Sequence, residues 1–192
     1  IYKIDKNGNR KRILGIIPGL WIAFRGKNSI VEIKEPFPKF CKCKIRLKNN
    51  SFVSIGSSGR IKKLNIIGES EQKFKIGNNF QSLSCELTAA NEKNLSIQIG
   101  DDCLFSKNII LRASDGHTII DKETKKILNY GKSIIVGNHV WIAGNVTILK
   151  GVTIGNNCVI GHGSIVTKKC KENSIYVGIP AKLVKENISW QG

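Results

Sequence analysis

The sequence predicts an all-β chain whose short strands coil and stack into a solenoid, because two spacings recur in its C-terminal third. An aliphatic residue returns every six positions, at Val136, Ile142, Ile148, Ile154, Ile160 and Val166. A small or β-branched residue follows four positions after each, at Val140, Val146, Val152, Cys158, Ser164 and Cys170. Residues two apart in a strand share a face, so each unit supplies one inward-facing strand and one polar turn. These spacings do not form a helical stripe, and such units bury their apolar face only by stacking.

The same phase predicts further strands upstream, within a single solenoid that we place at residues 20–180. Residues 20–47 alternate as strands do, beginning with Leu20, Ile22 and Phe24. Inward positions are expected at Ile55, Ile61, Ile67, Ile97, Ile99, Cys103, Phe105, Ile109 and Leu111. Residues 68–98 are less regular. A basic N-terminal arm at residues 1–19 and a short helical tail at residues 181–192 complete the expected organisation.

The positive charge of the chain raises the question of whether it binds an acidic partner. Thirty-one Lys and Arg stand against fourteen Asp and Glu among 192 residues, a net charge of +17. Residues 1–96 carry +12 of this excess, with nineteen basic and seven acidic residues. Nucleic acid, an anionic membrane, a phosphate-bearing cofactor and an acidic polysaccharide all fit such a balance, and so does a basic arm that is merely solvated. No run of eighteen apolar residues predicts a membrane-spanning helix.

The cysteines and histidines do not form a metal-binding pattern. Cys103, Cys158 and Cys170 occupy inward slots, as free thiols acting as small hydrophobes would, and no C-x-x-C pair occurs. Free thiols suggest a reducing, cytoplasmic compartment. His139 and His162 are twenty-three residues apart and do not stack, so we expect both to be turn residues near a ligand groove or subunit interface, and no metal site.

The run Val136–Val166, followed by Gly178-Ile179-Pro180-Ala181-Lys182, resembles the hexapeptide-repeat acetyltransferases. A narrower likeness, to bacterial capsule O-acetyltransferases that modify polysialic acid, rests on residues 114–117, Asp121, residues 132–141 and residues 148–151. Galactoside and maltose acetyltransferases share the more general pattern. The resemblance implies a left-handed parallel β-helix with three six-residue sides per coil. It also implies acetyl-CoA as co-substrate and a homotrimer with active sites between adjacent subunits.

Three residues are candidates for the catalytic site. Leu111 and Val136 are twenty-five residues apart, seven more than an eighteen-residue coil, so an excursion loop is expected at residues 113–133. His117 lies in this loop, and the resemblance implies that it is the general base, a task that suits an imidazole near neutral pH. Asp115 could orient that imidazole. Trp141 stands between two inward residues and should point outward, where it could line the acyl site, donate its indole N–H or pack in the subunit interface.

The coenzyme is expected along one corner of the coils. Ala143 and Gly161 are eighteen residues apart and should stack, leaving room for the pantetheine arm close to backbone amides. The resemblance implies that Thr167 and Lys168 lie near the adenine and the ribose phosphate, and that Lys182 and Lys185 belong to the same binding region. Lysine serves phosphate as a point charge.

These observations together predict an acetyl-CoA-dependent O-acetyltransferase acting on a sugar of a bacterial surface polysaccharide, with capsular sialic acid as the expected acceptor. Two alternatives stay open. One is an O- or N-acetyltransferase for a lipopolysaccharide sugar, a nucleotide sugar or a small molecule. The other is a non-catalytic solenoid that binds polyanions. Nucleic acid is not expected, because aromatic residues are not interleaved with the basic runs. We expect a cytoplasmic protein, which could lie at the inner face of the membrane.

Overall fold

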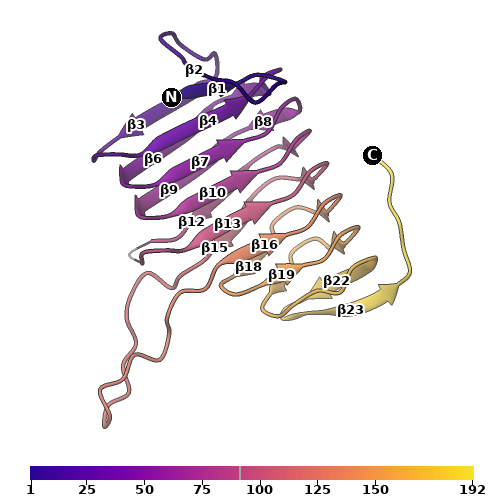
Figure 1. Cartoon of the computed structure of the whole chain (residues 1–192). Coiled ribbons are helices and arrows are strands. Elements are labelled where there is room, and N and C mark those ends of the chain that lie inside the picture. Colours follow the sequence, from indigo (N-terminus) through magenta and orange to yellow (C-terminus); the bar gives the residue numbers. More distant parts are fainter. Residues whose placement is uncertain (91) are drawn as a thin grey trace.

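The computed structural model describes residues 1–90 and 92–192, and its regular elements in those ranges are all β-strands (Figure 1). The strands form a parallel solenoid of about 7 turns, in which successive strands pass from one of three sheets to the next. Among the described residues, none belongs to a helix that could cross a membrane.

Each sheet stacks strands from successive coils, and an antiparallel hairpin adds β2 (Arg10–Arg12) to sheet A and β23 (Ala181–Glu186) to sheet C. Sheet A contains β1 (Tyr2–Ile4), β2 (Arg10–Arg12), β4 (Ile30–Lys34), β7 (Phe52–Ile55), β10 (Lys73–Ile76), β13 (Ser96–Ile99), β16 (Ile134–Val136) and β19 (Thr153–Ile154). Sheet B contains β3 (Leu20–Phe24), β6 (Cys43–Asn49), β9 (Leu64–Ser70), β12 (Cys85–Thr88), β15 (Ile109–Arg112), β18 (Thr147–Leu149) and β21 (Ile165–Val166). Sheet C contains β5 (Lys39–Cys41), β8 (Arg60–Lys62), β11 (Gln81–Ser82), β14 (Leu104–Phe105), β17 (Trp141–Ile142), β20 (Val159–Ile160), β22 (Ser174–Gly178) and β23 (Ala181–Glu186).

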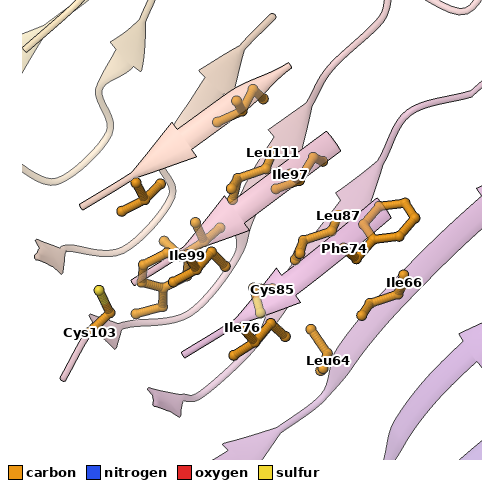
Figure 2. Packing of buried hydrophobic residues seen from close by; sticks show 14 of the residues in the cluster. Leu64, Ile66, Phe74, Ile76, Cys85, Leu87, Ile97, Ile99, Cys103 and Leu111 are labelled. Atoms are coloured by element: carbon orange, nitrogen blue, oxygen red, sulfur yellow. The ribbon is translucent and has the colours of Figure 1, made fainter. Parts of the chain in front are cut away.

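The core runs through the middle of the coils, where inward side chains from the three sheets meet (Figure 2). All twelve positions of the clean repeat between Val136 and Cys170 are buried, which confirms the predicted phase. Upstream, Ile97, Ile99, Cys103, Phe105, Ile109 and Leu111 are buried as expected. Parallel pairing in register continues this alternation from coil to coil, for example Leu87 beside Leu111 and Leu111 beside Ile148.

The expectation for Ile67 was wrong by one residue. Leu64 and Ile66 are buried, whereas Ile67 is only partly buried and faces outward. In the regular coils three residues separate inward Ile142 from inward Val146, but only two separate Ile61 from Leu64. The shorter turn, with Lys63 in a left-handed conformation at φ 47°, shifts the alternation of β9.

The two ends of the solenoid differ from the predicted arm and tail. β1 pairs in parallel with β4, so sheet A includes residues that we had placed before the solenoid. The short helical tail was wrong, because residues 181–186 form β23, antiparallel to β22. A six-residue segment is too short to offset the cost of helix nucleation, whereas the turn at Gly178 and Pro180 lets it complete its backbone hydrogen bonds against β22. Residues beyond β23 run back alongside the coils (Figure 1).

The predicted excursion loop leaves the solenoid between β15 and β16, at the corner where sheet B passes to sheet A. Figure 1 shows it projecting away from the stacked strands. Its far end is a narrow hairpin, in which Ile120 bridges to Ile127 and the amide of Asp121 donates to the carbonyl of Lys126 at 2.8 Å. The loop therefore carries its side chains well outside the core of this chain.

Candidate active site

The base of the loop is held by three polar side chains. Lys150 Nζ donates to Asp115 Oδ2 and, at 2.9 Å, to the carbonyl oxygen of Asn129. Asn129 Nδ2 donates to Asp115 Oδ2 at 2.9 Å and to the carbonyl oxygen of His117 at 2.8 Å. Hydrogen bonds from Lys150 and then from Asn129 lower the pKa of the Asp115 carboxyl. These contacts join the outgoing and returning arms of the loop to the corner after β18.

His117 is fixed through its backbone while its imidazole stays accessible. The residue is exposed and lines an open pocket of about 310 Å³ together with Glu92, Lys93, Asn129 and Tyr130. Within the described residues no hydrogen bond to the imidazole is seen, and the carboxylate of Asp115 is directed to Lys150 and Asn129. Asp115 thus positions the loop segment that carries His117, and the imidazole is left free to meet a substrate.

Trp141 lies on the outer face of sheet C, as its position in β17 predicts, and is 39% exposed. The C-terminal tail packs beside it. The indole of Trp190 stacks on the imidazole of His139, with ring centroids 4.1 Å apart, and its Nε1 donates to the carbonyl oxygen of His139 at 2.8 Å. The rings of Trp141 and Trp190 are 6.1 Å apart between centroids. Trp190 was not among the predicted site residues. A large aromatic residue within the otherwise polar C-terminal segment was the signal that its side chain packs against the solenoid.

The two remaining histidines lie in turns between strands, as expected, and these turns stack in columns from one coil to the next. His139 has a left-handed backbone at φ 53°, and its Nδ1 lies 2.7 Å from Asn157 Oδ1, while Asn157 Nδ2 donates to Asn173 Oδ1 at 3.0 Å. His162 Nε2 lies 3.1 Å from Asn145 Nδ2 in another column. Side-chain contacts of this kind link one coil to the next and fix the orientation of His139 beneath Trp190.

His117 and Trp141 do not meet within one chain. The loop leaves the corner between sheets B and A, whereas Trp141 points outward from sheet C, the side of the coil opposite that corner. The Asp115–Lys150 contact keeps the loop base at its corner. A site that uses both residues has to be assembled from two copies of the chain.

Four of the predicted coenzyme residues fall into two rows. Trp141 pairs with Val159 and Ile142 with Ile160, which stacks Ala143 on Gly161, and the next coil adds Val177, paired with Lys182. On sheet B, Ile148 pairs with Val166, so the register continues to place Thr167 over Leu149 and Lys168 over Lys150. Lys168 therefore stands at the corner that carries the loop. Lys185 pairs with Ile175, towards the other end of β22.

The surroundings of Ala143 and Gly161 narrow what a ligand could contact there. Their amides already donate to the carbonyls of Ile160 and Tyr176, at 2.9 Å and 2.8 Å. A Cβ on Gly161 would lie 2.6 Å from Cγ2 of Val177, so close packing of β22 alone explains the glycine. A coenzyme along this row would run over small side chains and the exposed Lys182, without a free amide from either residue.

The repeat and the loop together define a class of protein, the transferases built on six-residue β-solenoid repeats. The family described as bacterial transferase hexapeptide (six repeats) matches residues 133–168. The galactoside O-acetyltransferase of Escherichia coli (strain K12) is 32% identical over 162 residues, which cover 84% of this chain and 77% of that protein. The chain belongs to the hexapeptide-repeat O-acetyltransferases.

Further similarities are to polysialic acid O-acetyltransferases and to a galactoside acetyltransferase that holds coenzyme A. The polysialic acid O-acetyltransferase of Escherichia coli O1:K1 / APEC is 44% identical over 95 residues, which are 50% of this chain and 31% of that protein, so the matched segment spans less than half of this relative. The crystal structure of the polySia-specific acetyltransferase NeuO superposes with a TM-score of 0.77 at 28% identity, covering 93% of this chain and 85% of that one. A galactoside acetyltransferase in complex with coenzyme A superposes with a TM-score of 0.51 at 32% identity, covering 65% of this chain and 59% of that one.

Proposed function

We propose that the protein transfers an acetyl group from acetyl-CoA to a hydroxyl of sialic acid in a bacterial capsule polysaccharide. The observation that carries this proposal is the likeness to the polySia-specific acetyltransferase NeuO over 93% of the chain, which includes the basic N-terminal coils as well as the repeat. The coenzyme A complex of the related galactoside acetyltransferase supports acetyl-CoA as the donor.

In this mechanism His117 is the general base. Its imidazole takes the proton of the sugar hydroxyl as that oxygen attacks the thioester carbonyl carbon. The new C–O bond forms, the C–S bond breaks, and the proton passes on to the departing thiolate of coenzyme A. Trp141 of a neighbouring copy lines the acyl site and can donate its indole N–H to the oxyanion. Asp115 positions the loop through Lys150 and Asn129.

We infer that three copies of the chain form a closed assembly, as the resemblance to the hexapeptide-repeat acetyltransferases implies. Each loop would reach the outer face of sheet C in the adjacent copy, so that every site takes His117 from one subunit and Trp141 from the next. In this arrangement Thr167, Lys168, Lys182 and Lys185 hold the adenine and phosphate end of the coenzyme. All four side chains are exposed, and the three lysines supply the charge that phosphate requires.

The role of His117 is tested by acetyl transfer to a sialic acid polymer with His117→Ala. Removal of a general base is expected to lower kcat by about 10²–10⁴-fold. Lys122→Ala, in the same loop but away from His117, is the matched control and should retain wild-type kcat. Undiminished turnover in His117→Ala would remove the proposed base.

The acceptor is tested with a panel of sialic acid polymer, short sialic acid oligosaccharides and a neutral galactoside, with released thiol as the readout. We expect the sialic acid acceptors to react with the highest kcat/KM. If the galactoside alone reacted, the polymer assignment would be wrong and the galactoside activity named for the relative would take its place.

A further inference from the structure

The outer face of sheet B in the first three coils forms a basic groove that lies outside the site described above. A hollow of about 440 Å³ is lined by Trp21, Arg25, Lys42, Lys44, Arg46 and Lys63, together with Leu64 and Asn65. A second hollow of about 260 Å³ adjoins it and shares Arg25 and Arg46. We call the first six residues the basic groove.

Strand register explains why these residues gather. Trp21 pairs with Lys44, and Lys44 pairs with Asn65, while Arg46 lies two residues further along β6. Alternation points Lys44 and Arg46 outward, because their neighbours Ile45 and Leu47 are fully buried, and Trp21, which pairs with Lys44, is exposed on the same face. The half-exposed indole of Trp21 thus borders a row of cations.

The groove contains polar atoms that this chain does not satisfy. Arg46 Nε and Asn65 Oδ1 are both buried without a hydrogen-bond partner. None of the five cations of the groove forms an ion pair among the described residues, whereas the nearby Lys48 is neutralised by Glu69. The five unpaired cations of the groove can form charge-assisted hydrogen bonds with bound carboxylates.

The groove shares a sheet with the corner that carries the candidate base. Only β12 lies between β9, at the edge of the groove, and β15, from which the loop with His117 departs. Neighbouring strands are spaced about 4.8 Å apart, so β9 and β15 are separated by roughly 10 Å. A polymer held in the groove can therefore continue along sheet B towards the loop, while a single sugar at the loop cannot touch the groove.

We propose that the basic groove is a docking track for an anionic polysaccharide, which binds its carboxylates at Arg25, Lys44 and Arg46 and rests a sugar face on Trp21. This inference depends on the proposed function for the identity of the polymer. Charge complementarity with the five unpaired cations favours carboxylate-bearing chains. Long acceptors would gain affinity from the track, and short acceptors would not.

The test compares Arg46→Gln and Trp21→Ala with Lys75→Gln, a control at a basic position on the outer face of sheet A. For a long sialic acid polymer each groove variant should raise KM about tenfold with kcat unchanged, through loss of a charge-assisted contact in Arg46→Gln and of a sugar-stacking surface in Trp21→Ala. Turnover of a disialic acid acceptor should be unchanged. The KM for polymer should also rise with salt in the wild type and rise less in Arg46→Gln. Unchanged polymer KM in both groove variants would overturn the track.

Equilibrium binding of unmodified polymer to the same variants separates this inference from the proposed function. Binding needs no turnover, so a wild type that binds polymer through Arg46 without acetylating it would refute the proposed function and leave the track intact. Binding that is equally tight in wild type and Arg46→Gln would refute the track. If the groove bound anionic lipid vesicles and did not bind polymer, the surface would be a membrane-binding site and the polysaccharide track would also be refuted. Arg46→Gln should melt no lower than the wild type, because Arg46 Nε has no hydrogen-bond partner to lose.

Discussion

Asp115 shows how one carboxylate can act on a catalytic candidate without touching its ring. The sequence suggested that it orients the imidazole of His117, two residues away. In the structure it accepts hydrogen bonds from Lys150 and Asn129, and Asn129 in turn holds the carbonyl of His117. Lys150 comes from a coil that is adjacent only after folding, so residue spacing could not have revealed this arrangement.

Replacement of this carboxylate is expected to loosen the loop while the solenoid stays intact. Asp115→Asn should lower kcat about tenfold, since small displacements of catalytic groups are costly. The free energy of unfolding should fall by no more than ~1 kcal/mol, because the ion pair is partly exposed to solvent. Because the pKa of Asp115 is lowered by folding, the ion pair contributes its full stabilisation at pH values above the ordinary pKa of a carboxyl group. That stabilisation is lost as the pH falls through the pKa of folded Asp115.

Single-turnover acetyl transfer measures the effect on catalysis, and unfolding by urea measures the effect on stability. Asp121→Asn, which alters a carboxylate that caps the loop tip, serves as the control. Wild-type kcat in Asp115→Asn would show that the loop base tolerates loss of the charge.

The cysteines make a second prediction at the scale of residues. Burial raises the pKa of Cys85, Cys103 and Cys170 to about 12, and it also raises those of Cys43 and Cys158. Only the thiolate reacts with disulfide reagents, and Cys41 alone among the six is exposed. The native protein should release about one equivalent of chromophore per chain at neutral pH, and unfolded protein about six. Cys41→Ser should abolish the native reaction, and rapid labelling of several thiols would contradict the buried placement.

At the scale of elements, the repeat was predictable wherever its turns have constant length. Between Val136 and Cys170 every inward position followed from counting by six. The count failed at Ile67, where a turn loses one residue, because periodicity registers only the sum of strand and turn. The tail failed for another reason. A strand such as β23 is stabilised by its neighbour β22, and pairing of that kind leaves no period in the sequence.

The C-terminal tail is expected to stabilise the outer face of sheet C through Trp190. Trp190→Ala removes the stack on His139 and the hydrogen bond to its carbonyl, and should lower the free energy of unfolding by ~1–3 kcal/mol. Trp190→Phe keeps a stacking ring and loses only the Nε1 donor, so its effect should be smaller. Denaturant titration followed by the fluorescence of the remaining tryptophans measures both. Equal stability of all three proteins would mean that Trp190 does not pack against His139 in solution.

At the scale of the whole molecule, the separation of His117 and Trp141 could not be predicted from spacing, since it depends on which sides of a closed coil they occupy. It leads to a complementation experiment. In the proposed trimer, His117→Ala and Trp141→Ala should each be inactive alone. Mixed assemblies formed by co-expression should regain about a quarter of wild-type activity, the fraction of interfaces that pair two intact residues. Mixing after folding, without subunit exchange, is the control. Mixed assemblies as inactive as the parents would show that each chain completes its own site.

The antiparallel hairpins at the two ends also limit how far the chain can associate. A parallel stack ends in backbone N–H and C=O groups that invite another strand, the usual route to fibrous aggregates. Sheet A is closed at its N-terminal end by β2, whose three residues, Arg10, Lys11 and Arg12, are all exposed and positively charged. Sheet C is closed at the opposite end by β23, which reverses direction and carries Lys182 and Lys185. A further strand added at either of these two edges would meet an antiparallel strand that carries positive charge, so sheets A and C are each protected from growth at one end, while sheet B ends in the parallel strands β3 and β21.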